Sequence, residues 1–167
     1  WNYSHQILFI GPLDGLAAQY STPPSDAWSL FISKLDRHIS LYSSFMGYIE
    51  ATFGEGNPSD YPIQRIYSFR AGSTNKYFKA YKKLFSKFNK DGRLTLTGGF
   101  SAGTDSRDGN VWVVNAFKDF KGAFGGHQKL PSKFSNAETQ KAYAEYRKNR
   151  GEIEFKRGFL RILLATY

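Results

Sequence analysis

Residues 63–120 decide the fold, and they contain IQRIYSFRAG (63–72), STNKYFKAYKKLFSKFNKDG (73–92), RLTLTGGF (93–100) and, after a loop, NVWVVNAF (110–117). Hydrophobic periodicity predicts a strand, a helix and then two strands in these segments. A further apolar run, FLRILLATY at 159–167, predicts a last strand. This order of elements predicts an α+β fold in which helices cover one face of an antiparallel sheet.

The first strand and the helix after it have clear patterns. Residues alternate along the strand, so that Arg65 and Tyr67 face one side of the sheet and Ile66 faces the other. Ser73 is a typical N-cap for the following helix. The helical spacing predicts a buried stripe of Tyr77, Tyr81, Leu84, Phe85 and Phe88. Lysines occupy the rest of the helix surface.

The residues before this core predict a strand and a helix. The apolar run HQILFI at 5–10 stops at a Gly-Pro pair, which is typical of a strand entering a turn. Residues 11–24 predict a loop. Ser25 predicts the N-cap of a helix that continues to residue 43 or 44.

The remaining elements complete a single α+β domain over residues 1–167. Residues 45–53 fit either a strand or a continuation of the preceding helix. Residues 137–155 predict a charged helix, within which Gly151 is a candidate break. We expect residues 63–167 to form the core and residues 1–62 to form an N-terminal strand-helix extension. A chain of this length is long enough to bury one core.

Composition limits the classes of function. The net charge of +9 favours anionic partners. The absence of cysteine excludes disulfides and thiolate nucleophiles. No apolar run approaches the roughly 20 residues that a membrane-spanning helix needs. The chain starts at Trp1 instead of Met, so it is either a processed mature form or a trimmed chain, and the first of these favours a periplasmic or secreted protein.

The sequence offers little conventional catalytic chemistry. The stretch GFSAG at 99–103 matches a G-x-S-x-G motif, but a strand follows it where a nucleophile elbow needs a helix. The predicted structure there is therefore a glycine-rich hairpin loop. The histidines His5, His38 and His127 lack the spacing of metal ligands, so no metal site is expected. Catalytic residues stay unassigned.

The order of elements over residues 63–167 resembles the ferredoxin-like unit of the dimeric α/β-barrel superfamily, which includes antibiotic-biosynthesis-monooxygenase-like domains. IYSFRAG before a capped helix resembles that group's first strand and its Gly-containing turn. The hairpin at 94–117 resembles its middle strands, and NAFKDFKGAF at 115–124 is similar to the segment after them.

The resemblance implies a ferredoxin-like sheet that pairs with a second copy into a barrel, and hence a homodimer with an aromatic-lined pocket between sheet and helices. Some relatives oxidise aromatic polyketides without a metal or flavin, and some degrade haem. The haem-degrading members use an Asn on the first strand, which IQRIYSF lacks. On general grounds the pocket candidates are Arg65, Tyr67, Trp112 and Asn115, and the resemblance adds His127. The alternative is that Trp112 is a core residue and Asn115 a hydrogen-bonding residue at the sheet edge. No cofactor is expected.

We therefore expect a small-ligand-binding barrel-type protein of unknown activity that takes a small aromatic ligand. Cofactor-independent monooxygenation is among the activities that the resemblance implies. The alternative is a basic domain that binds nucleic acid or another polyanion, because lysines line the helix at 73–90 and aromatic residues are frequent.

Overall fold

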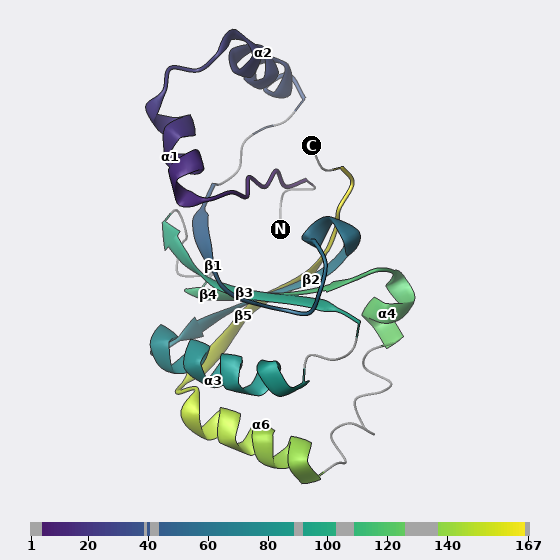
Figure 1. Cartoon of the computed structure of the whole chain (residues 1–167). Helices are drawn as coiled ribbons and strands as arrows, with labels where there is room; N and C mark the ends of the chain where they lie inside the picture. The colour runs from purple at the N-terminus through teal and green to yellow at the C-terminus, as the bar shows by residue number, and fades with distance from the viewer. Residues whose placement is uncertain are drawn as a thin grey trace. The chain divides into compact units, whose positions relative to one another are not determined.

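The computed structural model describes residues 5–38, 40, 44–88, 92–102, 109–125 and 137–165 (Figure 1). The chain divides into two compact units, Trp1–Ser44 and Phe45–Tyr167. The single-domain organisation over residues 1–167 stays a prediction. No described helix is long and apolar enough to cross a membrane.

The first unit contains two short helices, α1 (Leu13–Ser21) and α2 (Asp26–Leu35). The predicted N-cap of α2 is confirmed, because the Ser25 Oγ accepts a hydrogen bond from the Trp28 backbone N at 3.2 Å. The Trp28 ring packs against Phe9, with 5.7 Å between ring centres.

Three predictions for this unit are wrong. Residues 5–10 form no strand, and within the described part of the chain they pair with no other strand. The loop predicted at 11–24 contains α1, which Pro12 precedes at a position that its fixed φ suits. Helix α2 ends at Leu35 and does not continue to residue 43 or 44.

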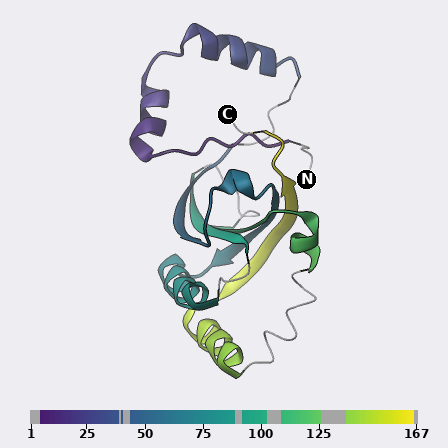
Figure 2. The same cartoon turned by 45° about the vertical axis from the view of Figure 1, so that its right-hand side comes forward.

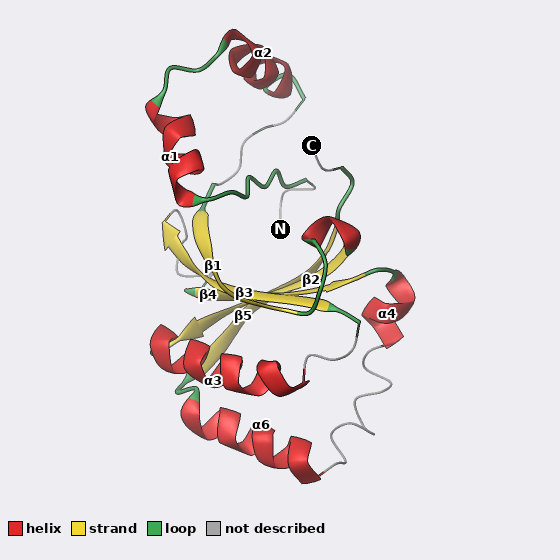
Figure 3. Cartoon of the chain, in the orientation of Figure 1, coloured by secondary structure: helices red, strands yellow, loops and turns green. Residues whose placement is uncertain are grey.

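The second unit is built on a five-stranded antiparallel sheet in the order β1-β3-β4-β2-β5 (Figure 3). The strands are β1 (Met46–Phe53), β2 (Ile63–Ala71), β3 (Leu94–Ala102), β4 (Val111–Phe117) and β5 (Ile153–Ile162). The last four strands have the ferredoxin-like order, which confirms the predicted fold class. The undecided segment at 45–53 is strand β1, which pairs with β3.

Helices α3 (Thr74–Phe88) and α6 (Ala137–Asn149) lie on the same face of the sheet (Figures 1 and 2). The Ser73 Oγ accepts from the Lys76 backbone N at 3.4 Å, as its predicted cap role requires. Tyr77, Tyr81 and Leu84 of the predicted stripe are buried, while lysines face outward. A short helix, α4 (Phe120–Gly125), follows β4.

The predicted helix at 137–155 is too long. Helix α6 ends at Asn149, because Gly151 adopts a left-handed φ of +73° that ends the helical path. Ile153 then pairs with Ala71 of β2, so β5 begins six residues before the strand predicted at 159–167.

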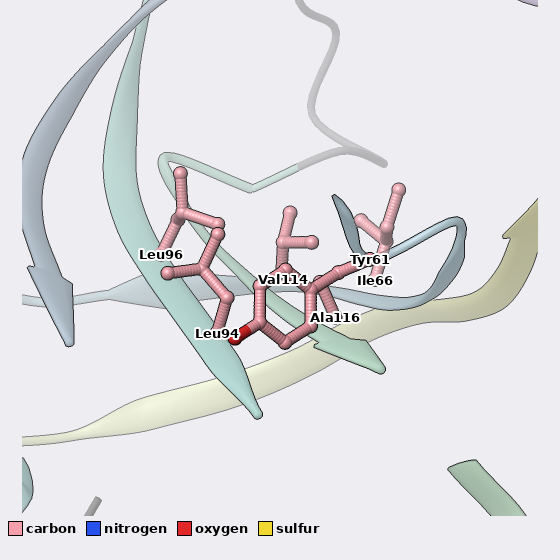
Figure 4. Packing of buried hydrophobic residues seen from close by; sticks show 6 residues of the cluster. All are labelled: Tyr61, Ile66, Leu94, Leu96, Val114 and Ala116. Carbon is pink, nitrogen blue, oxygen red and sulfur yellow. The ribbon is translucent and has the colours of Figure 1, made fainter. Parts of the chain in front are cut away.

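Among the described residues, the two larger hydrophobic clusters lie on opposite faces of the sheet. Beneath α3 and α6 the cluster includes Val111 and Val113 of β4. On the opposite face the buried residues are Tyr61, Ile66, Leu94, Leu96, Val114 and Ala116 (Figure 4). Tyr61 is anchored there because its hydroxyl donates to the Glu55 carbonyl at 2.6 Å. The helix-covered face contains the pocket described next.

Candidate functional site

An aromatic pocket of about 200 Å³ lies between the sheet and the two long helices. The sheet and both helices contribute side chains, which come from β2, β4, α3 and α6. The lining residues are Tyr67, Phe69, Val113, Asn115, Tyr77, Tyr81, Leu84, Phe85, Tyr143 and Tyr146. We call this the aromatic pocket.

Strand register brings the sheet residues of the pocket together. Strands β2 and β4 pair antiparallel, with Tyr67 opposite Val113 and Arg65 opposite Asn115. Side chains alternate between faces along each strand, so these four residues share one face of the sheet. Val113 belongs to the cluster beneath the helices, which identifies that face as the helix-covered one.

The helix residues of the pocket follow from helical spacing. Tyr77, Tyr81 and Phe85 recur every four residues and therefore lie on one side of α3. The rings of Tyr81 and Phe85 stack with their centres 4.2 Å apart and an interplanar angle of 10°. On α6, Tyr146 approaches Tyr81 with 6.3 Å between ring centres. These contacts make the helix side of the pocket almost wholly aromatic.

Asn115 supplies a polar group in these surroundings. It is half-buried, and its Oδ1 accepts a hydrogen bond from the Thr95 Oγ1 at 3.1 Å. Among the described residues, no acceptor is bound to the Asn115 Nδ2. An amide donor in an aromatic pocket is a suitable partner for a ligand oxygen.

Three tyrosines of the pocket, Tyr77, Tyr81 and Tyr146, are held in the neutral form. Burial raises the pKa of Tyr77 far above its ordinary value of 10.0, and the adjacent Tyr146 raises it further. Burial likewise raises the pKa of Tyr81 and the pKa of Tyr146. At neutral pH these phenols therefore act as hydrogen-bond donors or acceptors and not as bases.

The structure places only some of the residues that the sequence proposed for the pocket in its lining. Tyr67 and Asn115 line it. Arg65 lies on the same face of the sheet but does not line the pocket. Its NH1 group donates to the Ala123 carbonyl at 3.3 Å, and its guanidinium lies 5.6 Å from the Tyr67 ring centre. Trp112 packs on the opposite face, with its Nε1 donating to the Gly99 carbonyl at 3.1 Å. His127 is outside the described residues.

The role of the helix tyrosines was missed. Tyr77 and Tyr81 were predicted only as core residues, and Tyr143 and Tyr146 had no assigned role. The number of tyrosines could have indicated these pocket residues. Five of the lining residues are tyrosines, whereas a helix stripe that only packs the core favours aliphatic side chains.

Other candidate chemistry is not supported by the geometry. Ser101 lies within β3 and is exposed, so it does not occupy a strand-to-helix elbow. Within the described ranges, no three His, Cys, Asp or Glu side chains gather where they would hold a metal ion.

No family model matches the chain, and no curated protein matches it in sequence. Among solved structures, the chain is similar to one titled "Crystal structure study of anthrone oxidase-like protein". That similarity covers 91% of this chain and 68% of the other, with a TM-score of 0.49 and 9% sequence identity. A similarity this low carries no argument about activity, so the function has to be argued from the pocket.

Proposed function

We propose that this protein binds a small aromatic compound of one or two rings that carries an oxygen acceptor. The observation that supports this proposal is the aromatic pocket, where five tyrosines and two phenylalanines surround a single amide side chain. Aromatic walls favour a planar ring through stacked and edge-to-face contacts. One fixed polar group then orients the ligand.

The volume of the pocket limits the ligand. Apolar cavities of roughly 150 Å³ hold benzene, while pockets for larger ligands span about 300–1,000 Å³. The aromatic pocket has about 200 Å³. It therefore suits one ring with a short substituent or a compact pair of rings.

Binding is better supported than catalysis. Oxygenation of an aromatic substrate without a cofactor would require a base that removes a proton from the ring system. Among the described lining residues, Asn115 is neutral and the pKa values of Tyr77, Tyr81 and Tyr146 are raised, so none of these four is a base at neutral pH. A monooxygenase activity of the kind implied by the resemblance thus has no assigned proton acceptor.

The proposal predicts a difference between two ligands of matched shape, acetophenone and ethylbenzene. Both place a ring in the pocket, but only acetophenone accepts a hydrogen bond from the Asn115 Nδ2. In Asn115→Leu, we expect the Kd of acetophenone to rise about tenfold, which corresponds to the loss of about 1.4 kcal/mol. The Kd of ethylbenzene should change little. Titrations followed by NMR measure both constants.

Trp112→Phe is the matched control, because Trp112 lies on the opposite face of the sheet. It should leave both affinities unchanged. Failure of both compounds to bind the wild type saturably would refute the proposal. Equal losses in Asn115→Leu and Trp112→Phe would show that the effect does not come from the pocket.

We also propose that two copies associate, as members of the dimeric α/β-barrel superfamily do. The support is β5, an edge strand whose outer side pairs with no other described strand. Its exposed apolar side chains are Phe155, Leu160 and Ile162. An exposed apolar edge strand is a template for pairing with another strand.

Binding to a polyanion is the second candidate, and the exposed lysines Lys76, Lys79 and Lys87 of α3 favour it. Two other lysines on this helix are already paired, Lys82 with Glu50 and Lys83 with Glu145. The aromatic rings of Tyr77 and Tyr81 are buried and do not offer a surface for stacking bases. Retardation of RNA in a gel that weakens steeply with salt would support this candidate.

A further inference from the structure

A second pocket, of about 530 Å³, lies where the end of β2 meets the turn between α6 and β5. Arg70 and Gly72 contribute from the β2 side, Arg147 contributes from the last turn of α6, and Arg150 contributes from the position directly after that helix. Gly72 closes the junction, because its backbone N donates to the Glu152 carbonyl at 3.0 Å. We call this the arginine pocket.

Arg147 and Arg150 form no ion pair with an acidic residue of the described ranges. Two carboxylates, Glu152 and Glu154, also line the pocket. The Glu154 Oε1 accepts from the Lys156 Nζ at 2.7 Å, and neither carboxylate forms an ion pair with Arg147 or Arg150. The positive charge of these arginines is therefore not balanced by an ion pair.

Arg150 is positioned by packing and still has an unused donor. Its guanidinium carbon lies 5.2 Å from the centre of the Tyr146 ring, which holds the group by a cation–π contact. Its Nε is buried and, among the described residues, has no hydrogen-bond acceptor. The Arg150 guanidinium therefore keeps hydrogen-bonding capacity that no described protein group uses.

The helix dipole explains part of this arrangement but not all of it. Cationic side chains are stabilised in the last turn of a helix, which accounts for Arg147 and Lys148 as surface residues. The dipole does not explain why Arg70, from a different element, lines the same pocket. Nor does it explain the buried Arg150 Nε.

We propose that the arginine pocket binds the anionic group of a small organic molecule, either a phosphate ester or a carboxylate. The planar guanidinium groups of arginine match both anions through paired N–H···O bonds. The volume of about 530 Å³ leaves room for an organic part beside the anionic group. The site lies outside the lining of the aromatic pocket and does not depend on the function proposed for that pocket.

Glycerol 3-phosphate and succinate test the two kinds of anion, and neither contains a ring that would occupy the aromatic pocket. Each is titrated into the full chain by calorimetry at constant ionic strength. We expect one of them to bind saturably and Arg147→Gln to weaken it about tenfold, because a hydrogen bond to a charged group is lost. Arg147 is exposed, so this variant should remain folded.

Lys148→Gln is the matched control, since it removes one charge from the same turn but does not line the pocket. It should change the affinity less than twofold. A second measurement follows the Arg150 Nε–H signal by NMR, which should move downfield as the anion binds. No saturable binding of either compound, or equal losses in Arg147→Gln and Lys148→Gln, would overturn the proposal.

Discussion

Tyr77 links the sheet to both helices. Only 1% of its surface is exposed, and its hydroxyl interacts with Thr97 on β3 and Tyr146 on α6. Because burial disfavours the phenolate, the pKa of Tyr77 is raised in the folded protein above its ordinary value of 10.0. The neutral hydroxyl is therefore part of the folded arrangement.

This pKa shift predicts a loss of stability in alkali. Below the pKa that Tyr77 has in the unfolded chain, its phenol is neutral in both states and the folded state keeps its full stability. As the pH rises above about 10, the unfolded chain ionises first, so the free energy of unfolding declines. We expect the Tm to fall between pH 9 and pH 11, and to fall less steeply in Tyr77→Phe. Differential scanning calorimetry measures the slopes.

Tyr48→Phe is the control for this prediction, because Tyr48 is exposed on β1. Its slope should match that of the wild type. If Tyr77→Phe also has the wild-type slope, ionisation of Tyr77 does not contribute to the alkaline transition.

At the scale of elements, the short turn between α6 and β5 positions both pockets. It ends the helix that carries Tyr143 and Tyr146, and it begins the strand that pairs with β2. Gly151 makes this turn possible, because its φ of +73° is accessible to glycine at little cost. Other residues are strained in that conformation.

Gly151→Ala should lower the free energy of unfolding by about 1–2 kcal/mol, which is the cost of a left-handed backbone for a residue with a Cβ. Urea denaturation followed by circular dichroism measures the change. Gly72→Ala is the matched control across the same junction. A Cβ there would lie 3.8 Å from the Glu152 carbonyl oxygen, at ordinary contact distance. Equal destabilisation in both variants would contradict this account of the turn.

At the scale of the whole molecule, the proposed pairing of two chains depends on the edge strand β5. Light scattering after size exclusion should give the mass of two chains. Leu160→Lys places a charge on the exposed apolar side of this strand and should shift the mass to that of one chain. Leu164→Lys is the control, because Leu164 is exposed but lies beyond the end of β5. A wild-type monomer at all concentrations would reject the pairing.

Much of the fold was predictable because local patterns and tertiary packing agree over residues 63–117. The alternation of β2 and the capped stripe of α3 specify both elements and their buried faces. The end of α6 was misjudged because Ile153 and Phe155 also fit a helical stripe, and only their pairing with β2 makes them part of a strand. The run at 5–10 was misjudged because apolar residues form a strand only when a neighbouring strand is available.

The sequence alone determined the α+β class and the sides of the sheet that Arg65, Tyr67 and Asn115 occupy, because these follow from the spacing of residues along each element. Only the tertiary structure decided which of these residues line a pocket and that the tyrosines of α3 and α6 join Asn115 there. It also decided that Trp112 packs on the opposite face and that Arg70 and Arg150 line one pocket. Such assignments depend on strand register and on the packing of distant segments, which the pattern within one segment does not contain.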